Sequence, residues 1–213
     1  MVPSKANILM TRVAKEFCDL NDAAHGSDHM HDVVVKSYRI VAGNGLDADP
    51  TIVRLAALFH DTGRHIDVAN HHIESAKIFN RCNRLYQFVS KEDAELVTQA
   101  IEDHRASNPS DPRNIYGKIL STADRTFDID EVLKRTYTTT SHLNPNLTVD
   151  DIINMCGRHI SDKYGQYGYA YKRVYFETVD LKQFKDSIVE LINNPERFRD
   201  YILRVNNVEV SQQ

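Results

Sequence analysis

Histidine and aspartate gather in a few short segments of this chain, and together these residue types can hold a divalent metal ion. The segments are His25-Gly-Ser-Asp-His-Met-His-Asp32, His60-Asp61, His71-His72-Ile73-Glu74, and His104 with the later Asp124. Imidazole with carboxylate suits a divalent transition metal, and a carboxylate-rich set suits magnesium. A metal so held can activate water and stabilise charge on a phosphoryl oxygen. The pattern therefore predicts a metal centre.

The pair His60-Asp61 is the strongest local signal. It follows the apolar run from Ile52 to Phe59 and comes just before a Thr-Gly break. Polar residues at the end of a buried helix need hydrogen-bond partners or a ligand. The same pair also suits a plain C-terminal cap, because histidine is favoured at a helix end and aspartate tolerates turns. The dipeptide alone leaves both interpretations open.

The wider motif order resembles the HD-domain superfamily, whose signature is a histidine, a His-Asp pair and a distant aspartate on a later helix. The matching pieces are His29 in "DAAHGSDHMHDVV", the pair in "LAALFHDTG", and Asp124 in "KILSTADRTFDID". The resemblance covers about residues 8–130. It implies an all-α fold, a metal-dependent phosphohydrolase activity, and a metal held by His29, His60, Asp61 and Asp124.

The first motif also resembles a bacterial subgroup that opens with Asp-x-x-His-Asp-x-x-His. Asp22, His25 and His29 align with it, whereas Gly26 stands where the subgroup has its second aspartate. His31 lies two residues from His29, on a different side of a helix, so only one of the two can face a given centre. The motif register favours His29 as the ligand and His31 as a surface residue.

Two further histidines resemble second-site elements of the superfamily. His104 ends "AIEDHR" and resembles the Ile-x-x-His element, and His72 in "HHIESA" resembles the other second-site histidine. His71 is then expected to face solvent. If both His72 and His104 line the cavity, a two-metal centre results; we expect one ion, with His104 directed at a substrate phosphate.

The resemblance gives Asp61 and His104 catalytic roles and leaves the cations near the motifs open. Asp61 is expected to orient or deprotonate water as well as bind metal, and His104 to stabilise the phosphate or the leaving oxygen. Arg64, Lys118 and Arg125 are candidates for binding the phosphate group. The alternative for each of the three is a solvated charge on a helix surface.

These residues predict hydrolysis of a small phosphate ester or anhydride, such as a nucleotide, by a phosphomonoesterase or phosphodiesterase. The cofactor expected is a divalent ion from the set Mn, Fe, Co, Ni, Zn or Mg. One alternative is a non-catalytic HD module that keeps its metal and serves ligand binding or regulation. Another is an HD-related oxygenase with a di-iron centre.

Composition excludes several partners. The net charge is −4 with no basic stripe, which argues against polymeric nucleic acid. The N-terminus lacks the apolar core of a signal peptide, and no apolar stretch approaches the roughly 20 residues that span a membrane. Cys18, Cys82 and Cys156 stand singly and form no CxxC pair, which is typical of a reducing compartment. We therefore expect a cytoplasmic protein.

Apolar residues recur at helical spacing almost throughout, which predicts an all-α fold of nine or ten helices. The expected helices span about 4–20, a stretch around 33–41, a stretch from Pro50 to about 61, 71–88, 91–104, a stretch from about 115, 150–164, 181–192 and 196–206. The threonine-rich segment 136–146 ends in Asn-Pro-Asn, which favours a loop.

We expect a single domain over residues 1–213, an HD bundle with additional C-terminal helices. The HD core would cover about 8–130 and the C-terminal helical extension about 148–206. The tyrosine-rich segment 164–176 is interpreted as packing against the body of the protein or as a contact in a homo-oligomer. Base stacking by these rings is the alternative.

Overall fold

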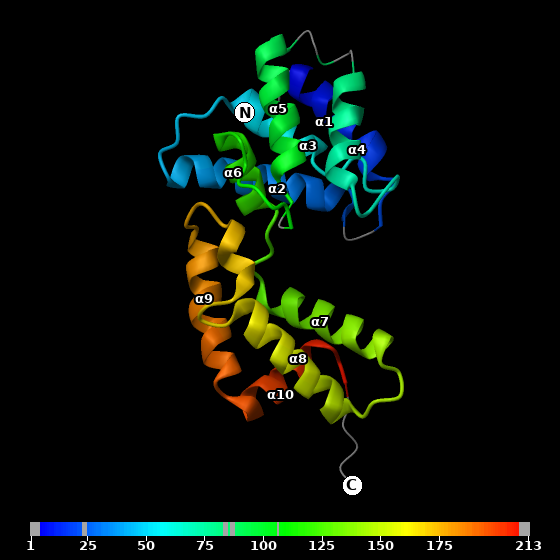
Figure 1. The fold of residues 1–213 in the computed structure, drawn as a ribbon, viewed down its shortest axis with the longest axis vertical. Helices are drawn as coiled ribbons and strands as arrows, with labels where there is room; N and C mark the ends of the chain where they lie inside the picture. The colour runs from blue at the N-terminus through cyan, green and yellow to red at the C-terminus, as the bar shows by residue number, and fades with distance from the viewer. Residues whose placement is uncertain (1–4, 23–24, 83–84, 86–87, 106, 209–213) are drawn as a thin grey trace. The chain divides into compact units, whose positions relative to one another are not determined.

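The computed structural model describes residues 5–22, 25–82, 85, 88–105 and 107–208, and the described residues are helical without any strand (Figure 1). This confirms the all-α prediction. The α-helices are α1 Lys5–Cys18, α2 Ser27–Gly43, α3 Pro50–Phe59, α4 His71–Arg81, α5 Lys91–Asp103, α6 Ile115–Ala123, α7 Ile129–Leu143, α8 Val149–Tyr164, α9 Val179–Ile192 and α10 Pro195–Val205.

The chain divides into two compact units. Unit 1 contains residues 1–125 and 173–176, and unit 2 contains residues 126–172 and 177–213. Figure 1 colours the helices of unit 1, α1–α6, from blue to green, and those of unit 2, α7–α10, from yellow-green to red. Each unit has a hydrophobic core of its own. The expectation of one domain that contains both an HD core and a C-terminal extension stays a prediction.

Helix α3 is the centre of unit 1. All of its residues from Ile52 to Phe59 are buried except Arg54. Its start is well defined, because the Asp49 carboxylate accepts hydrogen bonds from the amides of Thr51 and Ile52, and a proline occupies the first helical position. Helices α2, α5 and α6 pack around it. An apolar helix enclosed in this way offers a rigid base for polar residues at its end.

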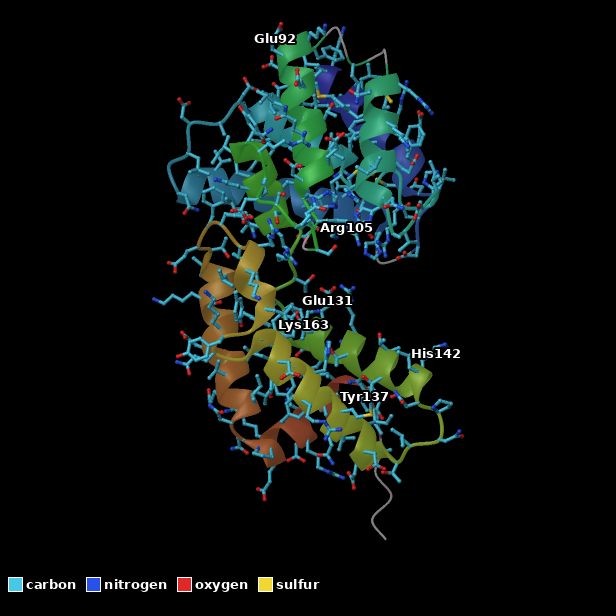
Figure 2. All side chains as sticks on the ribbon, in the orientation of Figure 1. Glu92, Arg105, Glu131, Tyr137, His142 and Lys163 are labelled. Atoms are coloured by element: carbon cyan, nitrogen blue, oxygen red, sulfur yellow. The ribbon has the colours of Figure 1, made fainter. Side chains whose placement is uncertain are left out.

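Three site candidates directly follow the ends of helices in unit 1. His60 follows α3, His104 follows α5 and Asp124 follows α6. Figure 2 shows Glu92 and Arg105 at opposite ends of α5, so His104 lies at the end marked by Arg105. Since helices α3, α5 and α6 pack on one another, their C-terminal ends can bring these residues to one place.

The prediction of a loop at 136–146 is wrong over most of its length, because α7 continues to Leu143. The Asp128 carboxylate caps the start of α7 by accepting from the Glu131 amide, and Val132 and Leu133 are buried in the core of unit 2. Threonine lowers helix propensity only by a few tenths of a kcal/mol per residue. The cap and the buried turn outweigh that preference.

Other boundaries differ slightly. Helix α4 ends at Arg81, whereas the sequence predicts a helix to 88; residues 83–84 and 86–87 lie outside the described part of the chain. Ser4 and the polar tail from 209 onward also lie outside it. No described helix has both the length and the apolar character to cross a membrane.

Part of the tyrosine-rich segment packs inside unit 2. The Tyr171 hydroxyl donates to the carbonyl of Tyr164 at 2.9 Å, and the Tyr164 ring lies edge-on to Phe184 at 5.2 Å between ring centres. Tyr167, in contrast, is 91% exposed. The packing interpretation therefore applies to Tyr164 and Tyr171 and does not extend to Tyr167.

The contact between the turn after α3 and the start of α4 generates a test of the fold. Gly63 donates its amide to the Ser75 hydroxyl at 2.8 Å, and a Cβ on Gly63 would lie 2.4 Å from the Ser75 nitrogen. Gly63→Ala should therefore lower the free energy of unfolding by about 1–3 kcal/mol, measured by urea denaturation. Gly43→Ala is the control, because its Cβ meets nothing within 4 Å. Equal midpoints for the two variants would contradict the close approach.

Candidate metal centre

Three histidine rings of unit 1 are held by backbone carbonyl groups. Nδ1 lies 2.8 Å from the Ala57 oxygen in His60, 3.0 Å from the Val68 oxygen in His71, and 2.7 Å from the Ile101 oxygen in His104. A carbonyl oxygen only accepts, so Nδ1 carries the proton in each ring. In the neutral ring Nε2 then presents a lone pair, as a metal ligand does.

His29, His60 and the two aspartates form the first group of ligand atoms. The Nε2 atoms of His29 and His60 lie 3.1 and 3.5 Å from Oδ1 of Asp124. Their distances to Oδ2 of Asp61 are 3.7 and 3.4 Å. His60 and Asp61 are buried, whereas the side chains of His29 and Asp124 are 22% and 28% exposed. Solvent therefore reaches the group on the side of His29 and Asp124.

A second group lies on the other oxygen of Asp61. Oδ1 of Asp61 is 3.3 Å from Nε2 of His71 and 3.9 Å from Nε2 of His104. All three residues are buried. The geometry that suits a metal ion recurs here, since the ligand atoms of Asp61, His71 and His104 lie within 4.8 Å of one another, as do those of His29, His60 and Asp61.

His71, and not His72, belongs to this second group, which corrects the prediction from sequence. His71 was expected to face solvent, yet it is only 8% exposed and its Nε2 lies 3.3 Å from that of His104. The physical reason is that His71 lies on the face of α4 that packs against the rest of unit 1. Ser75, Ile78 and Phe79, all buried, follow His71 at positions four, seven and eight, so His71 shares their face. The helical spacing of these residues from His71 is the sequence pattern that indicates its buried position.

The ligand atoms of each group lie close enough together to share a proton or a cation. Nε2 of His29 is 3.3 Å from Nε2 of His60, and the same distance separates His71 from His104. The neutral rings of His71 and His104 present two lone pairs that cannot bond to each other, and the Asp61 carboxylate beside them is an acceptor too. A buried cluster of acceptors is stable only with protons or a cation inside it. The donor set therefore fits a divalent ion at each group.

Charge states follow from the same arrangement. Burial lowers the pKa of His104 to about 4 and also lowers the pKa of His71, so both rings are neutral at neutral pH. Burial alone would lower the pKa of His60 too, but the Asp61 and Asp124 carboxylates outweigh it and hold that pKa well above 6.5. A proton on His60 therefore competes with a cation for this place.

The two aspartates are ionised. Burial by itself raises the pKa of each carboxyl group, but the imidazoles beside them outweigh burial and bring both pKa values below the usual value of 3.8. For Asp61 the main opposing influence is His60, and for Asp124 it is the hydrogen bond with His29. Two negative charges thus stand among the imidazoles, which balances one dication.

Asn21 braces the turn that carries the His-Asp pair, a role that sequence reasoning missed. Its side-chain nitrogen donates to the carbonyl oxygens of His25 and Asp61, at 2.9 and 3.0 Å, while its oxygen accepts from the His65 amide at 2.9 Å. The side chain therefore links the segment before α2 to the turn after α3. Asparagine is too common in loops for its type alone to reveal such a contact.

The motif before α2 forms a small network of its own. Nδ1 of His25 lies 2.7 Å from Oδ1 of Asp22, and Nε of Arg64 donates to Oδ2 of the same carboxylate at 3.3 Å. The His25 ring meets the His29 ring edge-on at 5.7 Å between centres. Gly26, which replaces the subgroup's aspartate, precedes α2 as its cap residue. Asp22 therefore links His25 and Arg64 through its two carboxylate oxygens.

The remaining candidates from the sequence are Lys118, Arg125 and His31. Lys118 lies over the Tyr175 ring, with Nζ 5.8 Å from the ring centre, and Nε of Arg125 donates to the Ser121 carbonyl at 3.2 Å. Their role in substrate binding stays a prediction. His31 is exposed on α2, on the side away from Met30 and Val33, which are buried. Its position agrees with its interpretation as a surface residue.

Comparison with known protein families gives one match. The family described as HD domain matches residues 26–127, a span that includes His29, His60, Asp61, His71, His104 and Asp124. No curated protein and no solved structure matches the chain.

The neighbouring histidines of α4 provide a matched test of the second group. His71→Ala should reduce the number of Mn²⁺ ions bound per chain, or weaken the weaker site by more than about tenfold, because it removes one of three buried ligands. His72→Ala should leave Mn²⁺ binding within about twofold of wild type. Isothermal titration calorimetry on protein first stripped with a chelator would measure both. Loss of binding in the His72 variant alone would show that the wrong ring was assigned.

The low pKa of His104 predicts how stability depends on pH in the metal-free protein. His104 stays neutral in the fold down to about pH 4, whereas the unfolded chain takes up its proton near pH 6.5. The contribution of His104 to stability should therefore fall as the pH drops from 6.5 to 4, by at most about 3 kcal/mol, whereas the raised pKa of His60 acts in the opposite direction. His104→Gln should show a shallower fall in urea denaturation across that range. Parallel curves for the variant and wild type would contradict the assigned neutral ring.

Proposed function

This chain belongs to the HD-domain superfamily, and on that premise we propose that it is a metal-dependent phosphohydrolase. The proposed substrate is a small phosphate ester or anhydride, such as a nucleotide. One observation carries the proposal: Asp61 is buried with each carboxylate oxygen facing a pair of imidazole nitrogens. Ionised carboxylates that share a site with imidazole nitrogens are typical of catalytic divalent-metal sites.

We further propose that the site takes two ions, with Asp61 shared between them. The sequence favours a single ion with His104 directed at phosphate. Support for a second ion comes from the tight group of Asp61, His71 and His104. The Nε2 atoms of the two buried histidines lie 3.3 Å apart. In this arrangement His104 acts as a ligand. The metal identity is left among Mn, Fe, Co, Ni, Zn and Mg.

The chemistry of the proposed reaction divides between the metal and the chain. A bound divalent ion lowers the pKa of water and stabilises charge that develops on phosphoryl oxygens. Asp61 positions both groups of imidazoles and, as an ionised carboxylate, can orient a water molecule for attack. Arg64, held by Asp22, is the cation that we propose for the substrate phosphate. The partly exposed His29 and Asp124 leave that group open to substrate.

Removal of a residue from the first group tests the proposed function. His60→Ala or Asp61→Ala should lower metal-dependent hydrolysis by more than about 100-fold, since even outer partners of metal ligands often cost 10–100-fold. Helix content by circular dichroism should stay near wild type. Nitrophenyl phosphate, its diester and nucleoside triphosphates with Mn²⁺, Co²⁺, Ni²⁺ or Mg²⁺ form the assay panel.

His31→Ala is the control for this test, because His31 lies two residues from His29 and is exposed. It should retain activity, whereas His29→Ala should lose it. A wild-type protein that binds these metals and hydrolyses nothing in the panel would favour the non-catalytic HD module. Activity that survives in both the His60 and Asp61 variants would refute the assigned centre.

A further inference from the structure

Residues 173–176 lie far along the chain from the HD match yet belong to the unit that carries the metal centre. The residues on either side of this segment belong to unit 2, whereas the segment itself packs in unit 1. Phe176 contacts the core of unit 1. We call residues 173–176 the strap. Its contacts reach two places next to proposed ligands: the loop after His104 and the last turn of α6, which precedes Asp124.

The guanidinium of Arg173 holds the loop after His104. It donates to the carbonyl oxygen of Asn108, to that of Ser110 at 2.6 Å, and to the Asp111 carboxylate at 3.0 Å. The Tyr175 hydroxyl donates to the same carboxylate at 2.8 Å. The Arg173 side chain is only 13% exposed. These contacts use the several fixed donors of one guanidinium, a geometry that a lysine ammonium cannot reproduce.

Asn108 of this loop is hydrogen-bonded to the backbone at the end of α5. The side-chain nitrogen of Asn108 donates to the carbonyl of Glu102 at 2.9 Å, and its amide donates to the carbonyl of Arg105 at 3.2 Å. These two carbonyls lie on either side of His104 in the chain. Arg173 therefore fixes Asn108, and Asn108 fixes the backbone that carries the buried His104 ring.

The backbone of the strap is tied to α6. The Ser121 hydroxyl donates to the carbonyl of Arg173 at 3.2 Å, and the Tyr175 amide donates to the Thr122 hydroxyl at 3.0 Å. Ser121 and Thr122 are buried in the last turn before Asp124. The strap thus joins the helix end that carries Asp124 to the loop that follows His104.

We propose that Arg173 is a positioning residue for the metal centre, through which a segment outside the HD match keeps His104 in place. The effect on metal binding rests on the proposed function, whereas the restraint on the loop does not. Arg173 touches no proposed ligand. Its side chain donates to the loop and to the Tyr175 hydroxyl of the strap. Its loss should therefore act on the group of Asp61, His71 and His104 and leave the group of His29 and His60 intact.

The test compares Arg173→Lys with Arg199→Lys in the full chain. Arg199 is a matched control, because it also pairs with an aspartate, Asp150, but lies in unit 2. In metal-free protein, hydrogen–deuterium exchange of residues 104–114 should accelerate in the Arg173 variant, with α4 unchanged. In Mn²⁺ titrations the weaker site should lose about tenfold in affinity and the tighter site less than twofold. Thermal midpoints show whether each variant is folded.

Tyr175→Phe is a second, milder variant, since it removes the hydroxyl that donates to Asp111 and accepts from Arg173 at 3.2 Å but leaves the Arg173 guanidinium in place. It should accelerate exchange in the same loop to a smaller extent. Unchanged exchange over residues 104–114 in both variants would overturn the proposal, as would faster exchange with both Mn²⁺ affinities unchanged. If the wild type binds no Mn²⁺, the proposed function fails, and the restraint is judged by the exchange data alone.

Discussion

The buried carboxylate of Asp61 is the constraint on which the arrangement of unit 1 depends. Each of its oxygens faces two imidazole nitrogens, and those of the neutral His71 and His104 rings are acceptors because Nδ1 carries the proton. Acceptors buried together in this way favour a proton or a cation among them. A cation bound among these ligand atoms would therefore couple metal binding to the stability of unit 1.

The centre also requires that its histidine rings keep one tautomer, and the helix ends provide this. His60 and His104 each use Nδ1 to satisfy a carbonyl oxygen in the last turn of the helix that they follow, which caps α3 and α5 and fixes the tautomer in one contact. The cap and the ligand interpretations of the His-Asp pair are thus compatible. Three helices also direct their C-terminal ends, which carry partial negative charge, toward the ligands, and this favours a cation there.

The unit that holds the centre is larger than the matched family region. Helix α1 precedes residue 26 and packs against α3, and the strap 173–176 returns after α8 to join α6 with the loop after His104. Unit 2 has its own core of apolar side chains from α7–α10. In the sequence the strap is flanked on both sides by residues of unit 2.

The sequence by itself determined the all-α class and the ligand positions that a local motif specifies. Apolar periodicity and the cap at Asp49 placed α3, and the motif order singled out His29, His60, Asp61 and Asp124, which the fold brings together. Only tertiary structure decided between His71 and His72, because adjacent positions differ by about 100° and the packing of α4 selects one face. The same holds for Asn21 and Arg173. Their contacts join segments 40 and 65 residues apart, and no local pattern encodes such a pairing.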